Sequence, residues 1–212
     1  MRKNLLQLIG ATAVTFAVAM SAAVLAQRPG DTLNNRAKQA GGKLVWRYRP
    51  NHSVIYANVE ELAKRSDLIV VGRTRQHLPA LTPDKKFVTD DFVVHVQEVI
   101  KGDVAAGKDM VISLPGGAYK FPDGTFAYVM AAHYKPAEKG GIYIFFLKTK
   151  KKLSGIKGYQ LSSATQGLFG FKNGQVEPAD QFATDPIVVR YRGMSAAAFL
   201  AEVHKAVPRQ KK

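Results

Sequence analysis

Residues 58–73 have the sequence NVEELAKRSDLIVVGR, in which a helix signal runs directly into a strand signal. Asn58 is a favourable N-cap residue, and two glutamates follow it in the first turn, where the helix dipole favours acidic side chains. These features predict a short helix over 59–65. The apolar run within 67–73 is continuous rather than alternating, which is typical of a strand that is buried on both faces.

The chain after residue 73 carries short apolar segments separated by turn residues. Apolar and polar side chains alternate in several of them, as in half-buried strands. We expect strands at 92–100, 110–114, 126–130, 142–147, 159–162, 167–171 and 175–177. Pro122-Asp123-Gly124 and Asn173-Gly174 are typical of tight hairpin turns. Ser195 is an N-cap for a last helix over 196–206, whose apolar residues recur at helical spacing.

Strands and helices do not alternate along the chain, so a doubly wound parallel sheet is not expected. We predict a mainly β fold, namely a small antiparallel OB-like barrel or half-barrel with a short N-terminal helix and a C-terminal amphipathic helix. Barrel closure would also remove exposed strand edges. The predicted barrel domain covers 58–192, and the C-terminal helix and basic tail cover 193–212.

Residues 1–26 have the pattern of a cleavable secretory signal peptide. Arg2 and Lys3 precede an uncharged apolar stretch, and Val24-Leu25-Ala26 places small residues at a cleavage site. An uncleaved anchor is the alternative, because the stretch approaches the ~20 residues that span a bilayer. We expect export to the periplasm or the extracellular medium, with no transmembrane domain after cleavage. Residues 27–57 are then an extended lead-in segment.

The composition excludes several kinds of chemistry. The 212 residues include 31 Lys and Arg, 16 Asp and Glu and no Cys, which gives a formal net charge of +15. Without Cys there is no disulfide, no Cys-bound metal and no thiol nucleophile. The histidines are widely spaced and form no local ligand pair, so we expect neither a metal site nor a cofactor. They are His52, His77, His95, His133 and His204.

Two serines fall in partial matches to catalytic motifs. Ser195 lies in a sequence that lacks the last glycine of a nucleophile elbow, and Ser154 begins an S-x-x-K match within a Gly- and Lys-rich loop. Neither has the required context, which favours a non-enzymatic protein. A hydrolase whose residues meet only in space is one alternative. A carrier that holds a small hydrophobic ligand inside the barrel is another.

Four segments, 61–72, 96–103, 114–117 and 143–147, resemble a widespread and largely uncharacterised group of exported bacterial β-barrel domains. The pattern is more distantly similar to the OB-like barrel of netrin-type domains and tissue inhibitors of metalloproteinases. The resemblance covers roughly Asn58 to Glu177 and implies a fold more than an activity. Those inhibitors chelate their target's zinc through an N-terminal cysteine, and this chain has none, so that mechanism is not carried over.

Lysines concentrate in the predicted hairpin between the strands at 142–147 and 159–162. They are Lys148, Lys150, Lys151, Lys152 and Lys157. Such a cluster attracts anionic polymers in a salt-sensitive way, and the alternative is a solvated turn in a basic protein. Gly116 and Gly117 either expose backbone N–H groups to a ligand or form a bend at a barrel corner. We therefore predict a non-enzymatic exported binding module whose partner is a protein or an anionic polymer.

Overall fold

The computed structural model of the chain describes residues 31–49, 55–151, 157–163 and 165–208. The helices in these residues are α1 (Leu33–Gln39), α2 (Val59–Arg65), α3 (Pro186–Tyr191) and α4 (Ala196–Ala206). The strands are β1 (Lys43–Tyr48), β2 (Leu68–Leu81), β3 (Val88–Lys101), β4 (Asp109–Pro115), β5 (Gly117–Lys120), β6 (Phe126–Ala131), β7 (Ile142–Lys151), β8 (Lys157–Leu161), β9 (Leu168–Lys172) and β10 (Gln175–Pro178). The predicted mainly β fold is confirmed.

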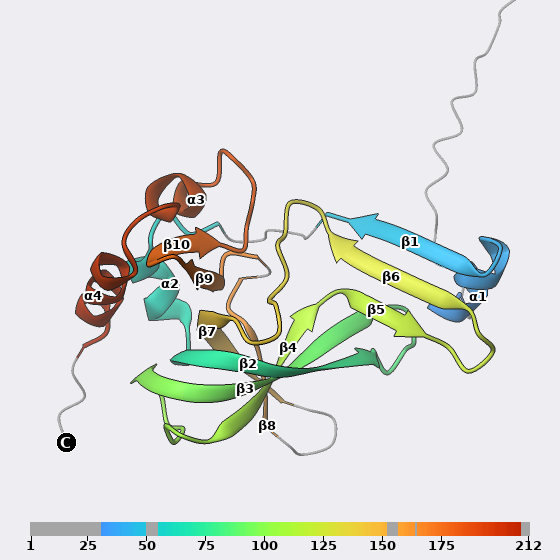
Figure 1. Ribbon diagram of the computed structural model, residues 1–212, viewed down its shortest axis with the longest axis horizontal. Coiled ribbons are helices and arrows are strands. Elements are labelled where there is room, and N and C mark those ends of the chain that lie inside the picture. Colours follow the sequence, from blue (N-terminus) through green and yellow to red (C-terminus); the bar gives the residue numbers. More distant parts are fainter. Residues whose placement is uncertain (1–30, 50–54, 152–156, 164, 209–212) are drawn as a thin grey trace, which may run out of the picture. The chain divides into compact units, whose positions relative to one another are not determined.

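Seven strands form one sheet in the order β10-β9-β7-β2-β3-β4-β8 (Figure 1). A further pairing of β7 with β8 turns five of them, β2-β3-β4-β8-β7, into a partly closed ring. The β4–β8 pairing is parallel, which corrects the antiparallel arrangement that we expected, and it spans only two residue pairs, Ile112↔Tyr159 and Ser113↔Gln160. Five strands cannot alternate in direction all the way round a ring, so one pairing in the ring has to be parallel.

The first half of strand β2 is buried on both faces, as the continuous apolar run predicted. Val70 belongs to a core cluster with Phe92 of β3 and Phe145 of β7, whereas its neighbour Ile69 belongs to a second cluster with residues of the helices. Val70, Phe92 and Phe145 are fully buried. Large side chains therefore occupy one face of the ring strands, and helices cover the other face of β2 and β7.

Helices α2 and α4 lie side by side and pack with α3 over the second face (Figure 1). Phe169 of β9 is at the centre of this contact, with ring centroids 5.7 Å from Phe146, 6.3 Å from Tyr191 and 4.8 Å from Phe199. The predicted caps are confirmed, because the side chains of Asn58 and Ser195 accept hydrogen bonds from backbone N–H groups in the first turns of α2 and α4. None of the helices in the described residues is long and apolar enough to cross a membrane.

The expected lead-in, 27–57, contains a helix that we did not predict. In α1 only Leu33 and Ala37 are buried, so the sequence carries little helical periodicity there. Strand β1 follows and pairs in parallel with β6 from Lys43↔Phe126 to Tyr48↔Ala131. This second parallel pairing joins the segment to a separate three-stranded sheet in the order β1-β6-β5.

The chain between β10 and α4 is held by buried polar contacts. The Asp185 carboxylate caps α3 by accepting from the N–H of Ile187 at 2.9 Å, and it also accepts from Gln166 Nε2 at 2.8 Å. The Gln166 carbonyl oxygen accepts from the N–H of Tyr56 at 2.9 Å. A buried polar group costs stability unless it is hydrogen-bonded, so these bonds allow the network to lie inside the protein.

Candidate functional site

The lysine cluster lies on the antiparallel ladder of β7 and β8. The register places Lys148 opposite Gln160, Lys150 opposite Gly158, and Lys151 opposite Lys157. Lys152 lies outside the described residues. Like charges that are directly opposite each other destabilise a strand pair. An anion bound at this end of the ladder would reduce that repulsion. We call Lys148, Lys150, Lys151 and Lys157 the lysine ladder.

Little negative charge is available to neutralise the lysine ladder. No Asp or Glu occurs in the sequence between Glu138 and Glu177, a stretch that includes all of β7, β8 and β9. Within the described residues, Lys148 forms no ion pair. The Asp67 carboxylate accepts a hydrogen bond from the N–H of Thr149, next to Lys148, at 2.9 Å. The ladder is therefore a local excess of positive charge.

A polar surface extends from Lys148, one member of the lysine ladder, onto the neighbouring strands. Gln160 of β8 is opposite Lys148 of β7 on one side and opposite Ser113 of β4 on the other. Directly opposed residues share a face of the sheet, so the three side chains form one row across three strands. Gln160 is exposed, and the other two are partly exposed. The row adds neutral hydrogen-bonding groups next to Lys148. Because successive residues of a strand face opposite sides of the sheet, positions 151 and 157 belong to the other face of this strand pair.

Gly116 and Gly117 lie where the chain passes from β4 in the large sheet to β5 in the small one. Their φ angles are +95° and +124°, in the region that favours glycine. The N–H of Gly116 donates to the carbonyl of Val88 at 3.0 Å, so it is engaged within the protein. No hydrogen bond or ion pair in the described part of the chain joins the two glycines to the lysine ladder. The geometry here is that of a bend between sheets.

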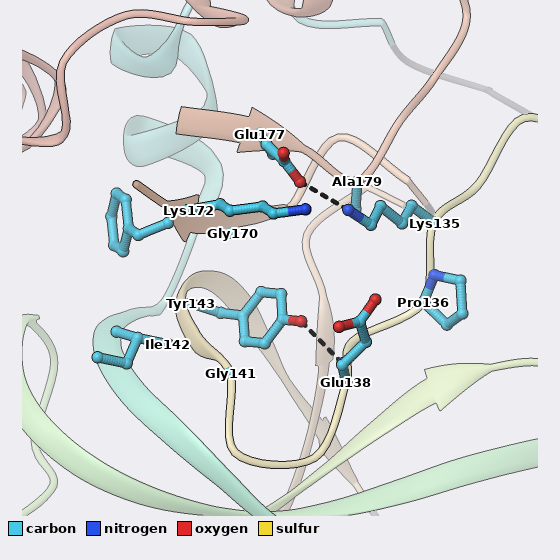
Figure 2. Close-up of a pocket in the computed structure, with 11 residues that line it drawn as sticks. Lys135, Pro136, Glu138, Gly141, Ile142, Tyr143, Gly170, Lys172, Glu177 and Ala179 are labelled. Atoms are coloured by element: carbon cyan, nitrogen blue, oxygen red, sulfur yellow. Dashed lines mark hydrogen bonds and ion pairs between the residues drawn. The ribbon is translucent and has the colours of Figure 1, made fainter. Parts of the chain in front are cut away.

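A pocket of about 200 Å³ lies beside the start of β7 and is lined by β9 and β10 (Figure 2). Lys135 Nζ forms an ion pair with Glu177 Oε2 at 2.6 Å, and the ammonium of Lys172 points toward the same place. The Tyr143 hydroxyl accepts from the N–H of Glu138 at 2.7 Å. The pocket thus combines fixed charges with one phenol.

The ion pair and the phenol of this pocket are held away from proton exchange at neutral pH. The hydrogen bond from Lys135 lowers the pKa of Glu177, and the same contact raises the pKa of Lys135. Burial raises the pKa of the Tyr143 hydroxyl. A general acid or base works best when its pKa is near the working pH. These three groups are therefore suited to fixing charge and not to transferring protons.

We expect Glu177→Gln to lower the free energy of unfolding at neutral pH by at most about 1 kcal/mol, because a solvent-screened ion pair contributes little. A lowered carboxyl pKa stabilises the fold above the unfolded pKa, and this contribution is lost as the pH falls through the folded pKa. The raised pKa of Lys135 makes its contribution disappear at strongly alkaline pH. Urea unfolding should therefore show the largest difference between about pH 5 and 10.

The control for this measurement is Glu138→Gln. The Glu138 carboxylate lines the same pocket but forms no ion pair within the described residues. Its replacement should change stability much less than Glu177→Gln, because the Glu138 carboxylate acts on Lys135 only through a weaker Coulombic interaction. A Glu177→Gln effect of the same size in acid as at neutral pH would contradict the ion-pair account.

Three of the described histidines each contact a different carboxylate. His77, His95 and His204 contact Asp90, Asp109 and Glu98 at 3.0, 2.8 and 2.9 Å. His52 lies outside the described residues. In the part of the chain that the structure describes, no three His, Asp or Glu side chains gather in a way that could hold a metal ion.

Sequence reasoning missed the groups of the pocket in Figure 2. Lys135, Tyr143 and Glu177 are spread over three elements or connections and are brought together by the pairing of β7, β9 and β10. The one hint in the sequence was Gly141. Its missing side chain leaves room for the Tyr143 ring, because a Cβ there would lie 2.5 Å from Tyr143 Cε2. No protein-family model and no curated protein matches this chain. The case for a function therefore depends on the sites themselves.

Proposed function

We propose that this protein is a non-enzymatic, exported binding module that holds an anionic polymer along the lysine ladder. The observation that carries the proposal is the β7–β8 register, which opposes Lys151 and Lys157 in a stretch that has no carboxylate. Lysine, serine and glutamine side chains are common partners of phosphate groups. The row formed by Ser113, Gln160 and Lys148 offers such side chains on one face of the same strand pair. The signal-like pattern of residues 1–26 supports export.

We also propose that the partly closed ring is an OB-like barrel. Numbered along the chain, its strands occur in the order first, second, third, fifth, fourth, and the third and fifth pair in parallel. OB-type barrels bind oligonucleotides and oligosaccharides with the loops between strands 1 and 2 and between strands 4 and 5. The β7–β8 connection is in the position of the second of these loops, which supports a polymeric ligand.

Retention on immobilised heparin and on single-stranded DNA tests the proposal. The triple variant Lys150/Lys151/Lys157→Glu should elute at a much lower salt concentration than the wild-type protein, because polyanion binding depends on released counterions. Positions 151 and 157 again carry like charges in this variant, so the repulsion between β7 and β8 is similar. Loss of retention would then reflect ligand binding and not altered strand pairing.

The matched control is Lys43/Lys108/Lys120→Glu. These lysines are exposed, form no ion pair in the described residues and lie on β1, before β4, and on β5. The control lowers the net charge by the same amount as the ladder variant. Equal losses in the two variants would show that overall charge alone drives retention, and full retention of the ladder variant would favour a protein partner.

A further inference from the structure

A second cavity of about 200 Å³ lies between the two sheets and is separate from the lysine ladder. The large sheet contributes His77, Asp90 and Phe92, and the small sheet contributes Tyr128 and Met130. Tyr134, from the connection after β6, completes the set of polar and aromatic groups. Apolar side chains and the Gly116–Gly117 bend provide most of the remaining wall. A mostly apolar cavity with a few polar groups is the usual form of a small-molecule site.

Two buried polar atoms of this cavity have no hydrogen-bond partner in the described part of the chain. They are Asp90 Oδ1 and the Tyr134 hydroxyl. Asp90 Oδ2, by contrast, contacts His77 Nδ1 at 3.0 Å, which fixes the carboxylate against the imidazole. Buried polar groups are rarely left without a partner, because desolvation without a hydrogen bond is costly. Because both residues line the cavity, a polar group of a ligand bound there would supply the partner that these two atoms lack.

The charges of the residues that line the cavity indicate the charge of the ligand group that it favours. Among the described residues of the lining, Asp90 is the sole carboxylate and there is no Lys or Arg, although the chain as a whole is strongly basic. Burial raises the pKa of Tyr134, so its hydroxyl stays neutral and can accept a hydrogen bond. Each of these two oxygens can accept a hydrogen bond from an ammonium group. The aromatic rings of Phe92 and Tyr128 also suit a cation.

We propose that this cavity binds a small primary amine with a single apolar ring, whose ammonium group donates hydrogen bonds to Asp90 and Tyr134. The size limit follows from the volume, since a cavity of about 150 Å³ accommodates benzene. The ring would lie among Phe92, Tyr128 and Met130, whose polarizable thioether packs well on aromatic groups. This site does not depend on the lysine ladder or on an anionic polymer.

Benzylamine, benzyl alcohol and benzoate, titrated into the full protein and followed by calorimetry and NMR, test the proposal. Benzylamine should bind saturably, and benzyl alcohol and benzoate should bind at least about tenfold more weakly, because they lack the charge that pairs with a buried carboxylate. Asp90→Asn should weaken benzylamine binding by at least about tenfold. Asp103→Asn, at an exposed position, is the matched control and should leave binding unchanged.

Tyr134→Phe keeps the test decisive if Asp90→Asn does not fold. It removes a hydroxyl that has no partner within the described residues, so the free protein should be at least as stable as wild type. Benzylamine affinity should nevertheless fall several-fold. Absence of saturable benzylamine binding, equal binding of benzyl alcohol, or undiminished affinity in either variant would overturn the proposal.

Discussion

Replacing Phe169 by alanine is expected to lower the free energy of unfolding by about 3–5 kcal/mol, the usual cost of removing a buried aromatic ring. Phe169 is fully buried, and its ring contacts Phe146 of β7, Tyr191 of α3 and Phe199 of α4. The substitution therefore opens a cavity where the sheet meets two helices. Natural domains are stable by about 5–15 kcal/mol, so the loss is a large part of the total.

Urea unfolding followed by circular dichroism measures this effect, and Phe182→Ala is the control. The Phe182 side chain is 50% exposed, and its truncation should change stability by no more than about 0.5 kcal/mol. Amide exchange in α3 and α4 should also accelerate in the Phe169 variant. Similar small effects at both positions would mean that the helices do not depend on Phe169 for their packing.

Charge reversal on the lysine ladder is expected to have the second large effect. In Lys150/Lys151/Lys157→Glu, the affinity for a heparin fragment or a single-stranded oligonucleotide should fall on the order of 100-fold at low salt, because attraction is replaced by repulsion. The Lys43/Lys108/Lys120→Glu control should lose far less. Direct binding by fluorescence anisotropy measures both, and identical losses would contradict a local site.

Elements whose signals are local in the sequence were predicted well. Both bounds of α2 and of α4 agree with the expected helices 59–65 and 196–206, since an N-cap and an apolar face are encoded within one segment. The β7–β8 hairpin was also predicted, because its two strands are neighbours in the sequence. Two short helices were missed. Helix α1 has few apolar residues, whereas α3 is apolar but only six residues long. In α3, the signal was present as Asp185 before Pro186, an N-cap followed by a proline in the first turn.

Long strands and distant contacts could not be predicted as well. Strand β2 continues to Leu81, but its second half is mostly exposed and contains Pro79, so apolar alternation is lost there. Its pairing with β3 is also interrupted by three register shifts, which break a simple period of two. The contact of His77 with Asp90 results from this pairing, and neither residue carries a motif. Cavity groups of this kind become visible only when the register is known.

The salt dependence of polymer binding tests the central claim most directly. For the wild-type protein, the logarithm of the binding constant should fall linearly with the logarithm of the salt concentration. In Lys150/Lys151/Lys157→Gln, the slope should become shallower by about two to three, roughly one for each lost lysine–phosphate contact. Lys43/Lys108/Lys120→Gln should keep the wild-type slope. An unchanged slope in the ladder variant, or an equal change in both variants, would contradict polyanion binding by the lysine ladder.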